Sequence, residues 1–180
     1  IVKVPLIVVD PRAAADATRG QVCDELVEAI DLAPTFLDAM GLPGAPQWLE
    51  GRSLQPLLHG TPPDPWREAV FSENSYAFRD PVRLPLGRPV DGCQMTMVRT
   101  KAWKYVHYEG LQPQLFDLEH DPDELLDLGT DPAHAAVREQ LATRLFDWLR
   151  QRKRATTIAH EDIEQWNRRE IDAGIRIGEW

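Results

Sequence analysis

The alternation of apolar and polar residues predicts a group of short strands in the middle of the chain. The β-type runs lie at residues 69–74, 93–100, 103–109 and 114–118. Short connections between the last three runs predict antiparallel hairpins, because parallel neighbours need a much longer crossover. A period of two places Trp103, Tyr105 and His107 on one face of their strand. We therefore expect a small antiparallel sheet.

A long helix is predicted directly after these strands, at about residues 132–152. Its apolar residues recur at helical spacing and are Val137, Leu141, Leu145, Trp148 and Leu149. Asp131 suits the capping position, because Pro132 follows it at the first helical position. An amphipathic helix of this length can cover one face of the sheet.

The N-terminal third of the chain has a different pattern. Val4 to Val9 is a continuous, mostly β-branched run, which predicts a strand buried on both faces of a parallel or mixed sheet. Apolar residues then recur at helical spacing from about Gln21 to Met40, which predicts a helix. Pro34 interrupts it, so we expect one turn, a break at residues 31–33, and a short helix capped by Asp31. Residues 43–68 are rich in proline and glycine and predict an irregular connection with one helical turn.

Charge and composition exclude several classes of function. The net charge of -9 disfavours nucleic acid and anionic membranes as partners, since both require a basic field. The longest apolar run is much shorter than a membrane span. Cys23 and Cys93 are the only cysteines and form no C-x-x-C pair, which favours free thiols and a cytoplasmic location. The chain starts without Met and almost at once enters a strand, so we expect a fragment.

The acidic stretch "LFDLEHDPDEL" raises the question of a calcium site. Its acidic residues are Asp117, Glu119, Asp121, Asp123 and Glu124. The helix-loop-helix calcium template requires glycine at its sixth position and glutamate at its twelfth. Counted from Asp117, this chain has Pro122 and Leu128 at those positions. The alternative is a strand that runs into a solvated acidic turn, and a calcium-binding domain stays a third hypothesis.

Motifs of self-contained catalysis are missing from the sequence. There is no G-x-S-x-G elbow, no phosphate-binding glycine loop, and no H-E-x-x-H, of which "HEDIE" supplies only two letters. The histidines are scattered, and we interpret each as structural: His59, His107, His120, His134 and His160. In "FSENSYAFRD", Tyr76 and Arg79 follow a strand in a long loop, where ligand contacts are common, although a solvated loop is the simpler interpretation.

Read in order, several segments resemble the C-terminal part of the sulfatase family, within the alkaline phosphatase superfamily. They are "VPLIVVDP", "AIDLAPTFLDAMGLP", "EGRSLQPLLHG", "WREAVFSE", "MVRTKAWKYVHY" and "QLFDLEHDPDELLDLGTDP". Within that family the "DPR", "FRD" and "DGC" segments and the tail "GIRIGEW" are most similar to phosphonate monoester hydrolases and their arylsulfatase relatives.

This resemblance implies an α/β fold whose end occupies residues 1–68. It implies a C-terminal subdomain over residues 69–180, α+β in the fragment, with an antiparallel sheet and a long helix. It also implies hydrolysis of a small anionic sulfate, phosphonate or phosphate ester by a formylglycine nucleophile and a divalent metal ion. A homo-oligomer is left open. Tyr76 and Arg79 would rim the substrate pocket, Arg79 because a guanidinium suits an oxyanion.

The chain departs from the family at the catalytic motif. No C/S-x-P-x-R occurs, since "DELV" follows Cys23 and "QMTM" follows Cys93. The family's metal-binding Asp-His pair and nearby lysine would precede residue 1. We therefore assign no catalytic residue and no metal ligand, and expect this chain alone to bind no cofactor and to be inactive. The alternative is a non-catalytic, stand-alone interaction module.

Overall fold

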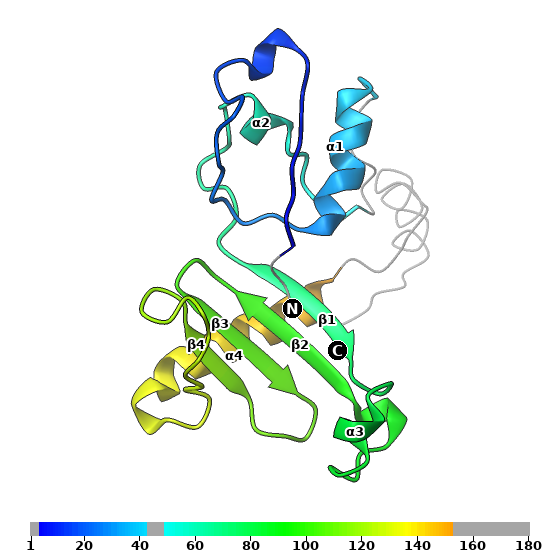
Figure 1. Ribbon diagram of the computed structural model, residues 1–180, viewed down its shortest axis with the longest axis vertical. Helices are drawn as coiled ribbons and strands as arrows, with labels where there is room; N and C mark the ends of the chain where they lie inside the picture. The colour runs from blue at the N-terminus through cyan, green and yellow to red at the C-terminus, as the bar shows by residue number, and fades with distance from the viewer. Residues whose placement is uncertain (1–3, 43–48, 153–180) are drawn as a thin grey trace, which may run out of the picture.

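A four-stranded antiparallel sheet forms the centre of the computed structural model, which describes residues 4–42 and 49–152 (Figure 1). The strands are adjacent in chain order: β1 (Val70–Ser75), β2 (Gln94–Arg99), β3 (Trp103–Tyr108) and β4 (Gln114–Asp117). The four strands and their antiparallel pairing confirm the sequence prediction. Local connections suffice for this topology, because each strand pairs with the next one along the chain.

The strand register brings one apolar row across the sheet. Phe71 pairs with Val98, Val98 with Tyr105, and Tyr105 with Leu115. Residues that are paired across strands lie on the same face, so this row forms a continuous apolar surface. The period-two prediction for β3 is confirmed by Tyr105, which belongs to the core on this face.

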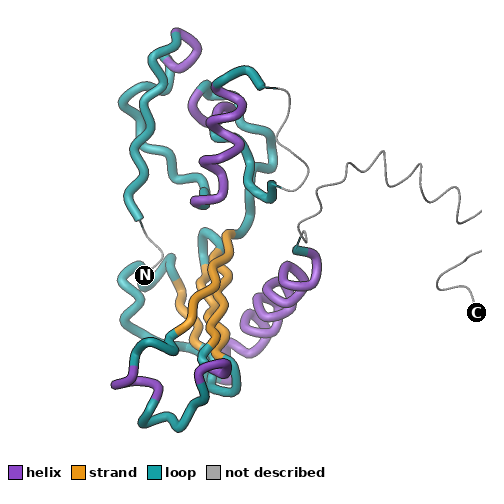
Figure 2. The backbone as a smooth tube through the Cα atoms, turned by 90° about the vertical axis from the view of Figure 1, so that its right-hand side faces the viewer, coloured by secondary structure: helices purple, strands orange, loops and turns teal. Residues whose placement is uncertain are grey.

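Helix α4 (Ala135–Gln151) covers that face of the sheet (Figure 2). Leu141 and Leu145 pack against Val98, Tyr105 and Leu115 to form the core. The Phe71 and Trp148 rings stack with centroids 4.5 Å apart. A 3-10 turn, η4 (Pro132–His134), precedes the helix, and the Asp131 carboxylate accepts a hydrogen bond from the Ala133 amide at 2.9 Å. The predicted helix, its apolar stripe and its cap are confirmed.

Carboxylates cap both edge strands of the sheet. The Phe71 amide of β1 donates to Glu28 Oε1 at 2.8 Å, and the Leu115 amide of β4 donates to Asp127 Oδ1 at 3.1 Å. An exposed edge with unpaired amides is a template for pairing with other chains, and these two contacts satisfy a donor at each edge.

The described residues before 69, which we call the N-terminal half, lie beyond one end of the sheet and contain only short helices (Figure 1). They are η1 (Ala13–Ala15), η2 (Ala29–Asp31), α1 (Leu32–Ala39) and α2 (Gln55–Leu58). The prediction of a strand from Val4 to Val9 is wrong for this structure. Residues 4–9 form no strand, and the Ile7 side chain is 90% exposed. A strand requires a hydrogen-bonding neighbour, and the described residues provide none for this segment.

The helix predicted from about Gln21 to Met40 is much shorter than expected. Residues 21–28 are irregular, η2 runs directly into α1, and Pro34 lies in the first turn of α1, where a missing amide costs no hydrogen bond. Asp31 occupies the capping position, but its side chain makes no capping bond to α1. The predicted break at residues 31–33 is therefore wrong, while the predicted turn in residues 43–68 is confirmed as α2.

A long connection joins β1 to β2 at the far end of the sheet. It contains α3 (Asp80–Arg83) and the 3-10 turn η3 (Val90–Gly92). Among the described residues, no helix combines the length and hydropathy that a bilayer crossing requires. The division into domains at residues 68 and 69 stays a prediction.

Candidate functional site

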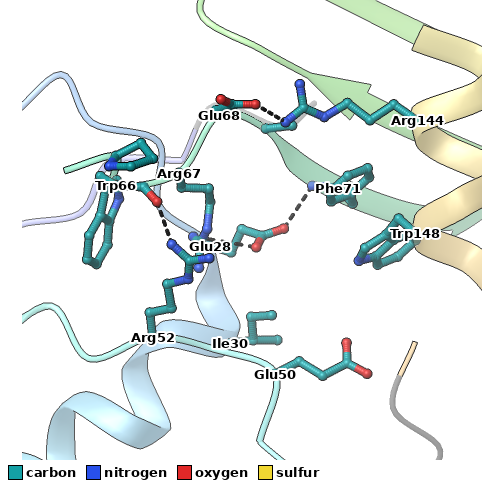
Figure 3. Close-up of a pocket in the computed structure, with 12 residues that line it drawn as sticks. Glu28, Ile30, Glu50, Arg52, Trp66, Arg67, Glu68, Phe71, Arg144 and Trp148 are labelled. Carbon is teal, nitrogen blue, oxygen red and sulfur yellow. Dashed lines mark hydrogen bonds and ion pairs between the residues drawn. The ribbon is translucent and has the colours of Figure 1, made fainter. Parts of the chain in front are cut away.

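A hollow of about 410 Å³ lies where the N-terminal half meets the sheet and α4 (Figure 3). Glu28, Arg52 and Trp66 come from the N-terminal side, and Phe71 and Trp148 come from β1 and α4. The walls therefore combine aromatic rings with charged groups, as ligand pockets often do. Whether these charged groups are already paired within the chain determines whether the hollow can bind a charged ligand.

Asp31 and Arg67 form a bidentate ion pair at the edge of this hollow. The two guanidinium nitrogens of Arg67 lie 2.6 and 2.7 Å from the two carboxylate oxygens of Asp31. Asp31 also accepts hydrogen bonds from the Arg52 and Glu28 amides, both at 2.8 Å, and its side chain is fully buried. Burial alone would raise the pKa of Asp31, but the Arg67 and amide hydrogen bonds outweigh it, so the pKa is lowered.

Glu28 connects the same ion pair to the sheet. Its Oε2 lies 3.4 Å from Arg67 Nη1, while its Oε1 accepts the Phe71 amide of β1. Burial raises the pKa of Glu28 and outweighs these two favourable contacts. Glu28 thus contacts both Arg67 and the first strand of the sheet, so its role here is to join elements.

Close backbone packing brings Arg52 into the junction. A Cβ on Gly51 would lie 2.1 Å from the Ile30 carbonyl oxygen, so only glycine allows this approach. Arg52 donates through Nη1 to the Trp66 carbonyl oxygen, and the Trp66 indole donates to the Leu26 carbonyl oxygen at 3.0 Å. The charged groups of Glu28, Asp31, Arg52 and Arg67 are therefore used in holding the chain together, and we interpret the hollow as a structural junction.

A second polar cluster holds the loop that follows residue 9. The carboxylate of Asp10 is nearly buried and accepts hydrogen bonds from the side chain and amide of Arg12, and it lies 3.0 Å from His59 Nε2. The Arg12 hydrogen bonds, followed by the His59 contact, hold the pKa of Asp10 well below its ordinary value. Arg12 also donates to Gln55 of α2. This cluster fastens the loop to α2.

The acidic stretch forms a turn with internal hydrogen bonds. Asp117 Oδ1 accepts the Glu119 amide at 3.0 Å, and Asp121 Oδ2 accepts the Leu126 amide at 2.8 Å. Glu124 forms an ion pair with Lys104 of β3. These contacts support the acidic-turn interpretation over a calcium loop, because two of the carboxylates bind the backbone and a third binds a lysine.

The two predicted rim residues lie in different environments. The Tyr76 ring is buried and meets Tyr108 edge-on with centroids 6.3 Å apart, while its hydroxyl has no hydrogen-bond partner among the described residues. Arg79 is exposed at the start of α3. No hydrogen bond joins the two side chains in the described structure, and their role at a substrate pocket stays a prediction.

The four described histidines all contact neighbouring side chains. His107 meets Phe146 edge-on, His134 packs near Trp103, and His120 lies 2.9 Å from Asp117. With His59 beside Asp10, these contacts support the structural interpretation. His160 lies outside the described residues.

Comparison with known proteins now places this geometry in a family. Residues 1–151 match the family model described as N-sulphoglucosamine sulphohydrolase, C-terminal. The chain belongs to this family. The multifunctional alkaline phosphatase superfamily protein PehA of Trinickia caryophylli is 32% identical over 81% of this chain and 28% of its own length. Arylsulfatase K of Rattus norvegicus is 38% identical over 71% of this chain and 21% of its own length.

Solved structures agree with this assignment to the sulfatase C-terminal family. The phosphonate monoester hydrolase of Agrobacterium radiobacter superposes with a TM-score of 0.65, at 33% identity over 74% of this chain and 27% of that one. The phosphonate monoester hydrolase of Silicibacter pomeroyi gives a TM-score of 0.64 at 31% identity, over 79% of this chain and 29% of that one. The chain thus spans less than a third of the length of these relatives.

In the part of the chain that the structure describes, the side chains do not fit the cofactors that the family resemblance implies. The Cys93 thiol is fully buried and donates to the Pro89 carbonyl oxygen at 3.2 Å, and Cys23 is exposed outside any formylglycine motif. In the described residues, Asp117, Glu119 and His120 bring ligand atoms within 4.8 Å of one another. The Asp117 carboxylate already accepts hydrogen bonds from amides of the turn, so these three residues do not make the metal centre that the family resemblance implies.

Sequence reasoning missed the ion pair of Asp31 with Arg67 and the contact of Asp10 with His59. Asp31 was expected only to cap a helix, and Arg67 had no assigned role. The partners are separated by 36 and 49 positions, and no spacing rule connects residues so far apart. The available signal was that Asp31, Asp10 and Arg67 all fall within the segments that resemble sulfatases.

Proposed function

We propose that this chain is the C-terminal part of a hydrolase of sulfate, phosphonate or phosphate esters, and that the nucleophile and metal ligands lie outside its 180 residues. The observation that carries the proposal is the family match over residues 1–151 in a sequence without C/S-x-P-x-R. The relatives are an arylsulfatase, a phosphonate monoester hydrolase and a multifunctional alkaline phosphatase superfamily protein, whose names support this range of esters.

The chemistry would be shared between the two parts of the protein. A hydrated formylglycine would supply the attacking oxygen and a divalent cation would polarise the ester oxygens. The residues of this chain would instead close and brace the enzyme. The junction of Glu28, Asp31 and Arg67 supports that role, because it fixes the N-terminal half to the end of the sheet.

The direct test is an ester hydrolysis assay of this chain with and without added divalent metal. We expect no hydrolysis of an aryl sulfate or a phosphonate monoester above the blank. Turnover that survives repurification would overturn the proposal.

The coding sequence upstream of Ile1 gives a second test: C/S-x-P-x-R followed by an Asp-His pair supports the hydrolase, whereas a native start codon directly before Ile1 supports the stand-alone interaction module.

We further propose that Tyr76 and Arg79 rim the substrate pocket of the complete enzyme. Arg79 is supported by its exposed guanidinium, which can pair with an oxyanion, and Tyr76 by its unpartnered hydroxyl. In the complete enzyme, Arg79→Ala should raise KM more than it lowers kcat, because substrate binding is lost first. Unchanged kinetics in both Arg79→Ala and Tyr76→Phe would remove the assignment.

A further inference from the structure

The connection between β1 and β2 exposes its apolar side chains, while two of its three arginines, Arg83 and Arg88, are only partly exposed. We call residues 78–90 the apolar loop. Phe78 is 96% exposed, and four other large apolar residues of the loop are exposed as well: Val82, Leu84, Leu86 and Val90. Arg83 donates to the Ala77 carbonyl oxygen at 3.1 Å, and Arg88 donates to the Gly92 carbonyl oxygen at 3.2 Å. Water favours the opposite arrangement, so this surface has the character of an interaction site.

A second surface of the same molecule has complementary chemistry. The acidic turn, residues 117–127, contains six acidic residues and no lysine or arginine, whereas the apolar loop contains three arginines and one aspartate. The acidic turn also exposes two apolar side chains, with Leu125 85% exposed and Leu126 next to it. Each surface thus offers apolar contacts together with the charge that the other lacks.

The sheet topology keeps these two surfaces apart within one molecule. The order β1-β2-β3-β4 makes β1 and β4 the opposite edges of the sheet. All neighbouring strands are antiparallel, so β1 and β4 finish at opposite ends as well (Figure 1). The apolar loop leaves the end of β1 and the acidic turn leaves the end of β4. They start from diagonal corners of the sheet, and their complementarity is available to a second molecule.

We propose that the apolar loop of one copy of this chain docks against the acidic turn of another copy. The contact is head-to-tail, because two different surfaces meet. Repetition of a head-to-tail contact closes into a ring or extends into an open assembly. Its apolar part excludes water around Phe78 and Leu125, and its charged part weakens at high salt. This inference does not depend on the proposed hydrolase activity.

The test is sedimentation velocity of the chain over a range of concentrations, at low and at high salt. We expect concentration-dependent association that salt weakens. Phe78→Asp places a negative charge opposite the acidic turn, and Leu125→Lys places a positive charge opposite the loop arginines. The association constant of each variant should be at least about tenfold lower than that of the unaltered chain, because like charges then face each other. Both side chains are almost fully exposed, so neither change should disturb folding.

A mixture of the two variants gives the decisive result. One contact in the mixture joins two unaltered surfaces, and the other joins the two altered surfaces, whose new charges are opposite. The mixture should therefore regain the association that each variant lacks alone. Matched controls are Ile7→Asp and Val22→Lys, at positions 90% and 88% exposed, and both should associate like the unaltered chain.

Four results would overturn the proposal. The unaltered chain could stay monomeric at every concentration. Leu125→Lys could leave association unchanged, which would indicate a symmetric contact between two apolar loops. Ile7→Asp could abolish association, which would place the contact at residues 4–9. The mixture could fail to regain association, which would show that loop and turn do not meet.

Discussion

The sheet with α4 and the N-terminal half are stabilised by different forces. In the sheet unit, Val98, Leu115 and Leu145 are fully buried, and the core is apolar. In the described residues before 69, the most completely buried side chain is the carboxylate of Asp31. Large apolar residues there, such as Ile7 and Phe36, are exposed instead. The sheet unit therefore has one contiguous apolar cluster, whereas the region before residue 69 buries separate apolar side chains, such as Leu54 and Trp66, and relies more on polar contacts between distant parts of the chain.

The difference shows what each kind of contact can do. Apolar burial is non-directional and roughly proportional to area, so it stabilises a sheet and helix whose faces already match. Hydrogen bonds and ion pairs are directional and favour one arrangement, but burying a carboxylate is unfavourable unless its partners remain in place. The N-terminal half should consequently be sensitive to single polar substitutions, and the sheet unit to single apolar ones.

The largest effect is expected from Arg67→Met. The substitution keeps the volume of the side chain but leaves the Asp31 carboxylate buried without its cation, which costs about 3–5 kcal/mol. We expect the amides of α1 to lose protection from hydrogen exchange, while those of β2 and β3 keep it. The measurement is native-state hydrogen exchange of each segment. A loss below about 1 kcal/mol would mean that the pair behaves as a surface ion pair.

The double variant Asp31→Asn with Arg67→Met is the control for that prediction. Asn removes the buried charge and keeps an oxygen that can accept one of the two amides bound by Asp31. Part of the lost protection of α1 should return, because the uncompensated charge is gone. If the double variant is less stable than Arg67→Met alone, the charge was not the cause of the destabilisation.

Leu145→Ala should destabilise the protein by a similar amount, but in the sheet and α4 instead of the N-terminal half. Leu145 is fully buried against the sheet, and replacing a buried leucine by alanine costs about 2–5 kcal/mol. Protection should fall throughout β2, β3 and α4, since all of them share this core. Leu149→Ala, at a partly buried position of the same helix, should cost less. Equal losses for the two variants, by chemical denaturation, would contradict the idea of a single apolar core.

The predictability of the two regions follows from the same physical difference. The strands and α4 could be predicted because their periods of two and 3.6 reflect one buried face, and their partners are close in sequence. Val4 to Val9 has an equally clear strand pattern, but pairing depends on a neighbour that the pattern cannot supply. The contacts of Asp31 and Asp10 could not be predicted, since a charged residue in sequence does not specify its partner.

Two glycines allow a matched comparison of the regions, with a smaller expected effect. A Cβ on Gly51 would lie 2.1 Å from the Ile30 carbonyl oxygen, and a Cβ on Gly129 would lie 2.0 Å from the Pro113 carbonyl oxygen. Either Gly→Ala change forces the backbone apart and should cost about 1–3 kcal/mol. Exchange should increase around Asp31 in the first variant and along β4 in the second. Loss of protection in both regions from either variant would show that they unfold as one unit.

The smallest effect is expected from acid on the loop after residue 9. The pKa of Asp10 is lowered by its Arg12 and His59 contacts, so its contribution to stability is complete above the ordinary carboxyl pKa of about 3.9. That contribution is lost only as the pH falls below that value toward the pKa in the folded protein. Exchange of residues 10–19, followed from neutral pH to about pH 3 and corrected for the intrinsic rate, should therefore increase only at the acid end. In Asp10→Asn the loop should already exchange faster at neutral pH and change less with acid, because the titrating carboxylate is absent. An acid response of the same size in both proteins would show that other carboxylates control the loop.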